Sequence, residues 1–334
     1  MTVSTVFLFV IPPVLLLLSA YFIFRKRHQV LLKDTENKLL ENGTHTISEA
    51  SKKLENHAAH LNPEKVQQFY NENTHRFLQV YGDIIQAYRT NDVTNYLDYT
   101  IKSAGLENDQ IILDAGCGIA GPARYFASKL DVQIKGCTIS DVQVDMAIEK
   151  IKAENLSNKI EVRQGDYHTM YEMYGENQFD RILFLESFGH SNNKTKLIEA
   201  AWKTLKPGGQ LYIKDLFERE ASNSTDAERI KEICYEINAG YQYNIANLYD
   251  VLKDIRRLGF ILNFVKTPEV EIGIFEHLTI SNQFQDLFNI SKIESWDNYV
   301  FPIDFYEIKC QKPAFDLNID KHLYFMNRKE LGAN

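Results

Sequence analysis

The sequence has few cysteines and no metal-binding motif built from them. Its four cysteines form no CxxC pair, and their spacing matches no zinc site: Cys117, Cys137, Cys234 and Cys310. The nine histidines are scattered along the chain. The residues therefore predict no metal site, and they predict reduced thiols in a cytosolic domain rather than a framework of disulfides.

An excess of positive charge is also missing. The chain carries 37 Lys and Arg against 45 Asp and Glu, a formal net charge of −8, and its one clear basic run is the short one at 25–27. Because binding duplex nucleic acid depends on neutralising many phosphates, this balance argues against nucleic acid as substrate or partner. The 44% hydrophobic and 25% charged residues over 334 positions are typical of a globular protein with a sizeable core.

The N-terminus differs sharply from the rest of the chain. Val3 to Phe24 is uncharged and largely apolar, and at about 1.5 Å per residue a helix of this length spans roughly 33 Å, enough to cross a bilayer. A cleaved signal peptide is the alternative, but no basic region precedes the apolar run and no small-residue cleavage site follows it. Arg25-Lys26-Arg27-His28 comes next, so the positive-inside rule predicts a single-pass membrane protein with its C-terminal domain in the cytoplasm, on the endoplasmic reticulum of a eukaryote.

The body of the chain alternates strand and helix patterns, which predicts an α/β fold: a doubly wound, mostly parallel sheet of seven strands. The predicted strands are 111–114, 132–138, 159–163, 179–185, 210–215, 260–265 and 305–310. We expect an anchor at 1–27, a polar stalk at 28–62, the folded domain at 63–312 with a helical cap from 63–100 and 220–257, and a tail at 313–334.

A glycine-rich turn follows the first predicted strand and carries the strongest functional signal. Leu113 to Gly121 reads L-D-A-G-C-G-I-A-G, where glycines let the backbone turn tightly against a ligand before a helix begins. The spacing G-x-G-x-x-G also occurs in dinucleotide sites, which place an acidic residue at the end of the second strand. Here that strand ends Gly136-Cys137-Thr138-Ile139-Ser140 without a carboxylate, which weakens the dinucleotide interpretation.

Four motifs together resemble the class I S-adenosylmethionine-dependent methyltransferases. Within them the chain is similar to the group of sterol C-methyltransferases, tocopherol methyltransferases, geranyl diphosphate C-methyltransferases and cyclopropane fatty-acid synthases. The motifs are I-L-D-A-G-C-G at 112–118, G-C-T-I-S-D-V-Q at 136–143, G-D-Y at 165–167 and L-K-P-G-G at 205–209. The resemblance covers about 110–217, and it implies a Rossmann-like fold with S-adenosyl-L-methionine as cofactor.

The resemblance also implies which residues bind that cofactor. Asp114, Gly116 and Gly118 would hold the methionine part and the loop, Thr138 and Gln143 the ribose, and Asp166 and Tyr167 the adenine. Tyr81 and Gly82 match a Y-G pair that closes over cofactor and substrate in the resembled enzymes. Taken without the resemblance, Asp166 could be a surface turn residue and Gln143 a solvated helix residue.

The segment Phe184 to His190 follows the fourth predicted strand, at the edge where open α/β sheets bind ligands. It resembles the E-[SA]-x-x-H of sterol and tocopherol methyltransferases. Glu186 is a candidate for binding the cofactor, or for stabilising or deprotonating a cationic intermediate. His190 is a candidate base, or a residue that supports another side chain of the site. The alternative is structural, with Glu186 capping the next helix and His190 satisfied in a loop.

These observations predict a methyltransferase that acts on a carbon of an isoprenoid or sterol-like lipid. The predicted anchor fits this interpretation because it keeps the enzyme beside substrates dissolved in the bilayer. An N- or O-methyltransferase of a lipid headgroup or small metabolite has the same cofactor site and is the first alternative. The second, from another class, is an inactive membrane-tethered protein that binds S-adenosylmethionine.

Overall fold

The computed structural model describes residues 48–314, apart from 89, 91, 271–284, 286–287, 289, 291 and 296–298. The chain divides into two compact units, Met1–Ser48 and Glu49–Asn334, and the second contains the described residues that follow Ser48. The membrane helix predicted at 3–24 lies outside the described residues. Within the described ranges, no helix is both long and apolar enough to span a membrane.

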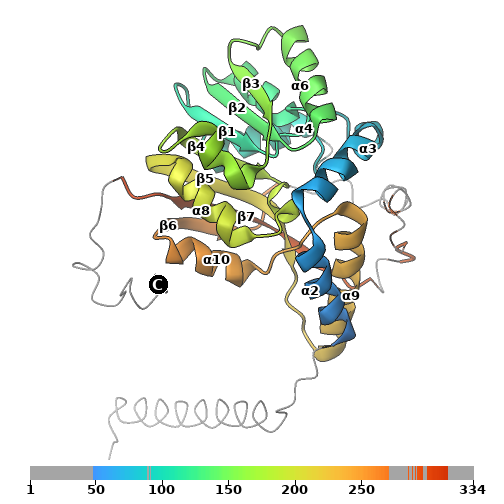
Figure 1. The fold of residues 1–334 in the computed structure, drawn as a ribbon. Helices are drawn as coiled ribbons and strands as arrows, with labels where there is room; N and C mark the ends of the chain where they lie inside the picture. The colour runs from blue at the N-terminus through green and yellow to red at the C-terminus, as the bar shows by residue number, and fades with distance from the viewer. Residues whose placement is uncertain are drawn as a thin grey trace, which may run out of the picture. The chain divides into compact units, whose positions relative to one another are not determined.

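A seven-stranded sheet forms the centre of the second unit, in the order β3-β2-β1-β4-β5-β7-β6 (Figure 1). Its strands are β1 (Ile111–Ala115), β2 (Gln133–Thr138), β3 (Ile160–Gln164), β4 (Phe179–Leu185), β5 (Leu205–Glu218), β6 (Ile261–Lys266) and β7 (Ile303–Gln311). The strands β1 to β5 are parallel, and β7 runs antiparallel to both β5 and β6. The predicted mostly parallel sheet of seven strands is confirmed.

Helices cover both faces of the sheet, which explains why its central strands read as nearly continuous apolar runs. On β1, Ile112 packs into one core with residues of α4 (Val93–Ala104), α5 (Gly121–Lys129) and α6 (Asp141–Ala153). The next residue, Leu113, points to the other face and packs with residues of α8 (Lys194–Thr204) and α10 (Leu248–Arg257). Short α7 (Met170–Tyr174) and two 3-10 turns, η1 (Tyr167–Thr169) and η2 (Phe188–His190), lie between strands.

Three helices form a cap beside the sheet: α2 (Glu49–His60), α3 (Pro63–Tyr81) and α9 (Ser224–Tyr241). Helices α2 and α9 lie side by side (Figure 1), and His57 Nε2 donates a hydrogen bond to the Tyr243 carbonyl at 2.8 Å. The compact unit therefore begins at Glu49, inside the segment predicted as a stalk. Helix α2 buries few apolar side chains, Ala50 among them. Its sequence pattern therefore did not indicate that it packs against another helix.

Candidate active site

The glycine loop lies between β1 and α5, and its two central glycines have different environments. Gly116 (φ +86°) and Gly118 (φ +54°) both adopt the left-handed conformation. A Cβ added at Gly116 would overlap the Ser187 side chain, with its Oγ 2.8 Å away. A Cβ added at Gly118 would meet nothing within 4 Å. Gly116 is thus required by packing, whereas Gly118 leaves open space beside the loop.

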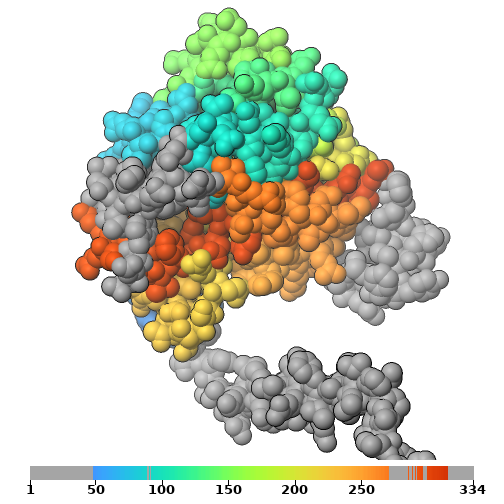
Figure 2. All heavy atoms as spheres, turned by 180° about the vertical axis from the view of Figure 1, so that it is seen from behind, coloured from blue at the N-terminus to red at the C-terminus, as the bar shows by residue number. Residues whose placement is uncertain are grey.

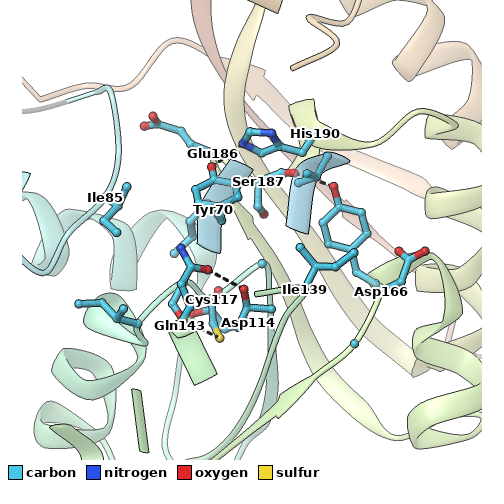
Figure 3. Close-up of a pocket in the computed structure, with 18 of the residues that line it drawn as sticks. Tyr70, Ile85, Asp114, Cys117, Ile139, Gln143, Asp166, Glu186, Ser187 and His190 are labelled. Atoms are coloured by element: carbon cyan, nitrogen blue, oxygen red, sulfur yellow. Dashed lines mark hydrogen bonds between the residues drawn. The ribbon is translucent and has the colours of Figure 1, made fainter. Parts of the chain in front are cut away.

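That open space belongs to a pocket at the carboxyl ends of the parallel strands (Figure 3). The pocket brings together every predicted site residue except Tyr81 and Gly82: Asp114, Gly116, Gly118, Thr138, Gln143, Asp166, Tyr167, Glu186 and His190. We call it the loop pocket. Residues that are far apart in the sequence converge there because parallel strands present their carboxyl ends at one edge of the sheet.

Asp114, at the end of β1, is buried with one carboxyl oxygen unsatisfied. Its Oδ2 atom has no hydrogen-bond partner among the described residues. Burial raises the pKa of Asp114 to about 7, because no positive group or donor offsets the loss of solvation. A buried, unpaired carboxyl is costly, so a donor or cation supplied by a ligand in the loop pocket would satisfy it.

Thr138, the last residue of β2, forms a pair with Gln143 in the first turn of α6. The Thr138 hydroxyl donates to Gln143 Oε1 at 2.6 Å, and both side chains are buried, so Gln143 is not a solvated helix residue. The Ser140 hydroxyl caps α6 by accepting a hydrogen bond from the backbone amide of Gln143 at 3.1 Å. The same hydroxyl donates to Asn71 Oδ1 of α3 at 2.6 Å. These bonds hold the cap helix α3 over the edge of the loop pocket.

Asp166 and Tyr167 lie after β3, on the opposite wall. Asp166 accepts hydrogen bonds from the His168 backbone amide at 2.9 Å and from His168 Nδ1 at 2.6 Å. Burial favours a higher pKa, but the bonds to His168 outweigh it and hold the pKa of Asp166 below its usual value. The Tyr167 hydroxyl donates to the Ser187 carbonyl at 3.0 Å. Asp166 therefore stays ionised at neutral pH.

Glu186 follows β4 with φ +58°, a conformation that is strained for a residue with a side chain. Its carboxylate accepts hydrogen bonds from the backbone amides of Ala87 and Tyr88, and it pairs with Lys214 of β5. Lys214 is fully buried, and its ammonium lies 5.1 Å from the centre of the Tyr88 ring and 4.8 Å from that of Tyr96. Glu186 is therefore a fixed, charge-compensated carboxylate rather than a helix cap.

His190 is the last residue of the turn η2. Its imidazole forms a hydrogen bond with Tyr70, a residue that the sequence motifs did not indicate. Its Nδ1 lies 2.9 Å from the Gln242 carbonyl, which can only accept, so Nδ1 carries the proton. The unprotonated Nε2 then accepts from the Tyr70 hydroxyl at 2.6 Å. Burial lowers the pKa of His190 to about 4, so the imidazole is neutral at physiological pH.

A second, apolar cavity of about 710 Å³ adjoins the loop pocket. We call it the apolar cavity. The two share one wall, made of Tyr70, Ile85, Gln86, Glu186 and His190. The rest of its lining is mostly aromatic and aliphatic, and includes Phe77, Val80, Tyr88, Leu216, Ile237, Tyr241, Tyr243, Ile290, Ile293, Tyr299, Phe301 and Phe305. Figure 2 shows that orange and red residues near the end of the described chain lie against the gold α9 on this side of the molecule.

Tyr81, which was predicted to bind the cofactor, lines the apolar cavity. Gly82 ends α3 with φ +61° and is not part of the lining of either space. Tyr81 therefore faces the apolar cavity, whereas Asp83, the residue after Gly82, lines the loop pocket. Three other residues of the site were missed: Tyr70, Gln86 and Lys214. The one signal available was the charge of Lys214 inside a predicted buried strand.

The fold and these two adjoining spaces define a Rossmann-like α/β protein with a nucleotide-type pocket beside an apolar one. The sequence model of mycolic acid cyclopropane synthetase matches residues 91–261, half of the chain. The chain belongs to this family, which confirms the resemblance stated above.

Individual relatives share part of the chain. A sterol 24-C-methyltransferase of Kluyveromyces lactis is 27% identical over 186 residues, 51% of this chain and 49% of that protein. Phosphoethanolamine N-methyltransferase 1 of Arabidopsis thaliana is 31% identical over 161 residues, 47% of this chain and 32% of that one. The chain thus spans about half the length, or less, of these curated relatives. The crystal structure of the [4+2]-cyclase SpnF covers 76% of this chain and 97% of its own, with a TM-score of 0.62 at 20% identity, a likeness of fold.

Proposed function

We propose that the protein is an S-adenosylmethionine-dependent methyltransferase that methylates a carbon of an isoprenoid or sterol-like lipid. The observation that carries the proposal is the shared wall between the loop pocket and the apolar cavity. A cofactor in the first space and a lipid in the second would meet at Tyr70, Glu186 and His190. The likeness to sterol 24-C-methyltransferases supports the same acceptor class.

The polar groups that line the loop pocket suit the polar groups of S-adenosylmethionine. The cofactor's ammonium would pair with the unsatisfied Oδ2 of Asp114, and Gly118 leaves room for it beside the loop. Thr138, Gln143 and Asp166 offer hydroxyl, amide and carboxylate groups around the same pocket for ribose and adenine. When bound, the cofactor supplies a methyl group activated by the sulfonium. The protein's part is to align the acceptor and exclude water.

Methyl addition to an alkene carbon leaves a carbocation on the acceptor, and the shared wall is suited to stabilise it. Glu186 provides a negative charge whose orientation is fixed by Lys214 and two backbone amides. The rings of Tyr70 and Tyr243 also line the apolar cavity, and aromatic faces attract cations. Because Lys214 and the amides occupy its oxygens, we assign Glu186 to electrostatic stabilisation and not to proton removal.

The proton that the carbocation must lose has a path through Tyr70 and His190. The acceptor's C–H proton passes to the Tyr70 oxygen while the Tyr70 proton moves to Nε2 of His190, 2.6 Å away, and the C–H electron pair closes the new double bond. A neutral imidazole is able to take this proton, and a carbocation is acidic enough to give it to a weak base. The hydrogen bond from Nδ1 of His190 to the Gln242 carbonyl keeps the unprotonated Nε2 facing Tyr70.

Methylation of an amine is the second candidate, because the chain is also similar to phosphoethanolamine N-methyltransferase 1. The lining of the apolar cavity disfavours it. Arg219 is the one positively charged side chain among the described lining residues, and it is already paired with Asp304. A phosphorylated amine would find little compensation for its charge there.

The predicted anchor is part of the proposal, since a tether would hold the apolar cavity near lipids. Alkaline extraction of membranes from cells that make the full chain tests it. We expect the full chain in the membrane pellet and a variant lacking 3–24 in the supernatant. Equal release of both would remove the anchor from the proposal.

Methyl transfer from S-[methyl-³H]adenosylmethionine tests the function itself. The full chain in detergent micelles receives, in separate reactions, a sterol with a side-chain double bond, a prenyl alcohol or phosphoethanolamine. We expect label in the organic phase with the sterol or prenyl alcohol, and roughly 100-fold less with a Glu186→Gln variant. Label only in phosphoethanolamine would favour the amine. Cofactor binding without transfer would favour an inactive binding protein.

A further inference from the structure

The lining of the apolar cavity is balanced in charge, which limits the kind of lipid it accepts. Among its described residues, the side chains with a formal charge are Glu186, Arg219 and Asp304. Glu186 is compensated from behind by Lys214, and Arg219 pairs with Asp304. No positive charge in the described lining is left over to neutralise an anionic ligand.

Arg219 and Asp304 lie together because of the antiparallel pairing of β5 with β7. Phe217 lies opposite Asp304 and Glu218 opposite Ile303, so the chain beyond β5 runs beside the start of β7. Arg219 Nη2 is 2.9 Å from Asp304 Oδ1, and its guanidinium lies 5.6 Å from the centre of the Phe301 ring. Both side chains line the apolar cavity, where a ligand can contact them.

This pair lies further along the sheet than the shared wall. Lys214, the partner of Glu186, and Arg219 are separated by five residues along β5 and just beyond its end. At about 3.3 Å per residue Arg219 lies up to roughly 16 Å beyond Lys214, and Asp304, opposite Phe217, lies roughly 10 Å beyond it. The apolar cavity therefore has a reacting end at Glu186 and a polar end at Arg219 and Asp304, with aromatic and aliphatic side chains between them.

We propose that Arg219 and Asp304 bind the hydroxyl group of an uncharged amphipathic lipid whose methylated carbon lies roughly 10–16 Å away. The inference rests on the proposed function and names its substrate class: a sterol-like alcohol rather than a prenyl diphosphate. A hydroxyl donates to the Asp304 carboxylate and accepts from the Arg219 guanidinium, which suits an ion pair with both groups accessible. A diphosphate would face the Asp304 carboxylate with a single cation that is already paired, so the repulsion between like charges would not be offset.

Binding of three ligands to the full chain in detergent micelles tests this inference without turnover. The probes are a radiolabelled 3-hydroxysterol with a side-chain double bond, its 3-deoxy counterpart, and geranylgeranyl diphosphate. We expect the hydroxysterol to bind roughly tenfold more tightly than the deoxysterol, since charge-assisted hydrogen bonds are lost in the latter. Arg219→Leu and Asp304→Leu should each remove this preference while leaving deoxysterol binding unchanged.

Two controls separate recognition from folding. Arg229→Leu removes an exposed arginine of α9 that pairs with Glu232 and does not line the apolar cavity, and it should keep the preference. The double variant Arg219→Asp/Asp304→Arg restores the pair and should recover part of it. Equal binding of the two sterols to wild type, including no binding of either, overturns the inference, as does tighter binding of the diphosphate. Methyl transfer to the same ligands, measured separately, shows whether the proposed function itself fails.

Discussion

The Tyr70 hydroxyl donates a hydrogen bond to Nε2 of His190 at 2.6 Å, joining the cap helix α3 to the turn after β4. The bond places a hydroxyl on the wall shared by the loop pocket and the apolar cavity, with a neutral nitrogen directly behind it. Proton removal in the proposed reaction depends on this pair. Glu186, on the same wall, contributes charge rather than a proton path.

Loss of either member of the pair should slow turnover without weakening cofactor binding. We expect Tyr70→Phe and His190→Gln each to lower kcat roughly 100-fold, the size of a general-base contribution, with the Kd for S-adenosylmethionine within twofold of wild type. Tyr249→Phe, at an exposed tyrosine of α10, is the matched control and should leave kcat unchanged.

Because the pKa of His190 is about 4, the imidazole is protonated only as pH falls towards that value, so kcat should show no histidine inflection near pH 6.5. Wild-type rates in both variants would remove the pair from the mechanism.

The buried pair of Lys214 and Glu186 predicts a large and specific effect on stability. Lys214→Met leaves the Glu186 carboxylate buried without its cation, which should lower the free energy of unfolding by about 3–5 kcal/mol in urea titrations. The double variant Lys214→Met/Glu186→Gln removes the orphaned charge and should recover most of the loss. Lys135→Met breaks a partly exposed pair with Glu161 and should cost at most about 1 kcal/mol. Similar losses for Lys214→Met and Lys135→Met would show that the buried pair contributes little.

Asp114 predicts how stability depends on pH in the cofactor-free protein. Its pKa is raised to about 7 in the folded state from an ordinary value of 3.8, so between these values the folded state holds a proton that the unfolded state has lost. The stabilisation is complete below the unfolded pKa and is lost as pH rises towards 7, with a slope that approaches about 1.4 kcal/mol per pH unit. Urea unfolding at pH 5, 6 and 7 should therefore show a smaller decline for Asp114→Asn than for wild type. Parallel pH profiles would contradict the raised pKa.

The two loop glycines should respond differently to the same substitution. Both Gly116→Ala and Gly118→Ala carry the strain of positive φ, about 1–2 kcal/mol. Only the first also forces a Cβ into Ser187, so we expect its melting temperature to fall further, with loss of soluble protein as the extreme. Gly118→Ala should fold but bind S-adenosylmethionine at least tenfold more weakly, because its methyl group enters the loop pocket. Equal melting temperatures in the two variants would contradict the packing role of Gly116.

The sheet was predictable because its signals are local. Strands buried on both faces read as short apolar runs, as in Ile111 to Ala115, and the glycine loop that follows β1 is a contiguous motif. The same holds for residues fixed relative to such a motif, such as Asp114 and the pair of Thr138 and Gln143. The sequence patterns placed these residues near one another through the topology of parallel strands alone.

The remaining parts of the site depend on pairings that no local pattern encodes. Tyr70 and His190 are 120 residues apart, and Lys214 meets Glu186 only because β4 and β5 are neighbours in the sheet. Tyr81 shows the converse: its motif matched, but the end of α3 directs it to the apolar cavity. The packing of helix α2 against α9 was missed because this mostly polar segment buries few apolar side chains.

The central claim is that a donor in the loop pocket methylates a lipid carbon in the apolar cavity, and the structure of the product tests it most directly. The full chain is incubated with S-[methyl-²H₃]adenosylmethionine and a side-chain-unsaturated 3-hydroxysterol, and the product is analysed by mass spectrometry and NMR. We predict a deuterated methyl group bonded to a side-chain carbon of the sterol. A deuterated methyl group on the 3-hydroxyl oxygen, or an unchanged sterol in the presence of bound cofactor, would contradict the account.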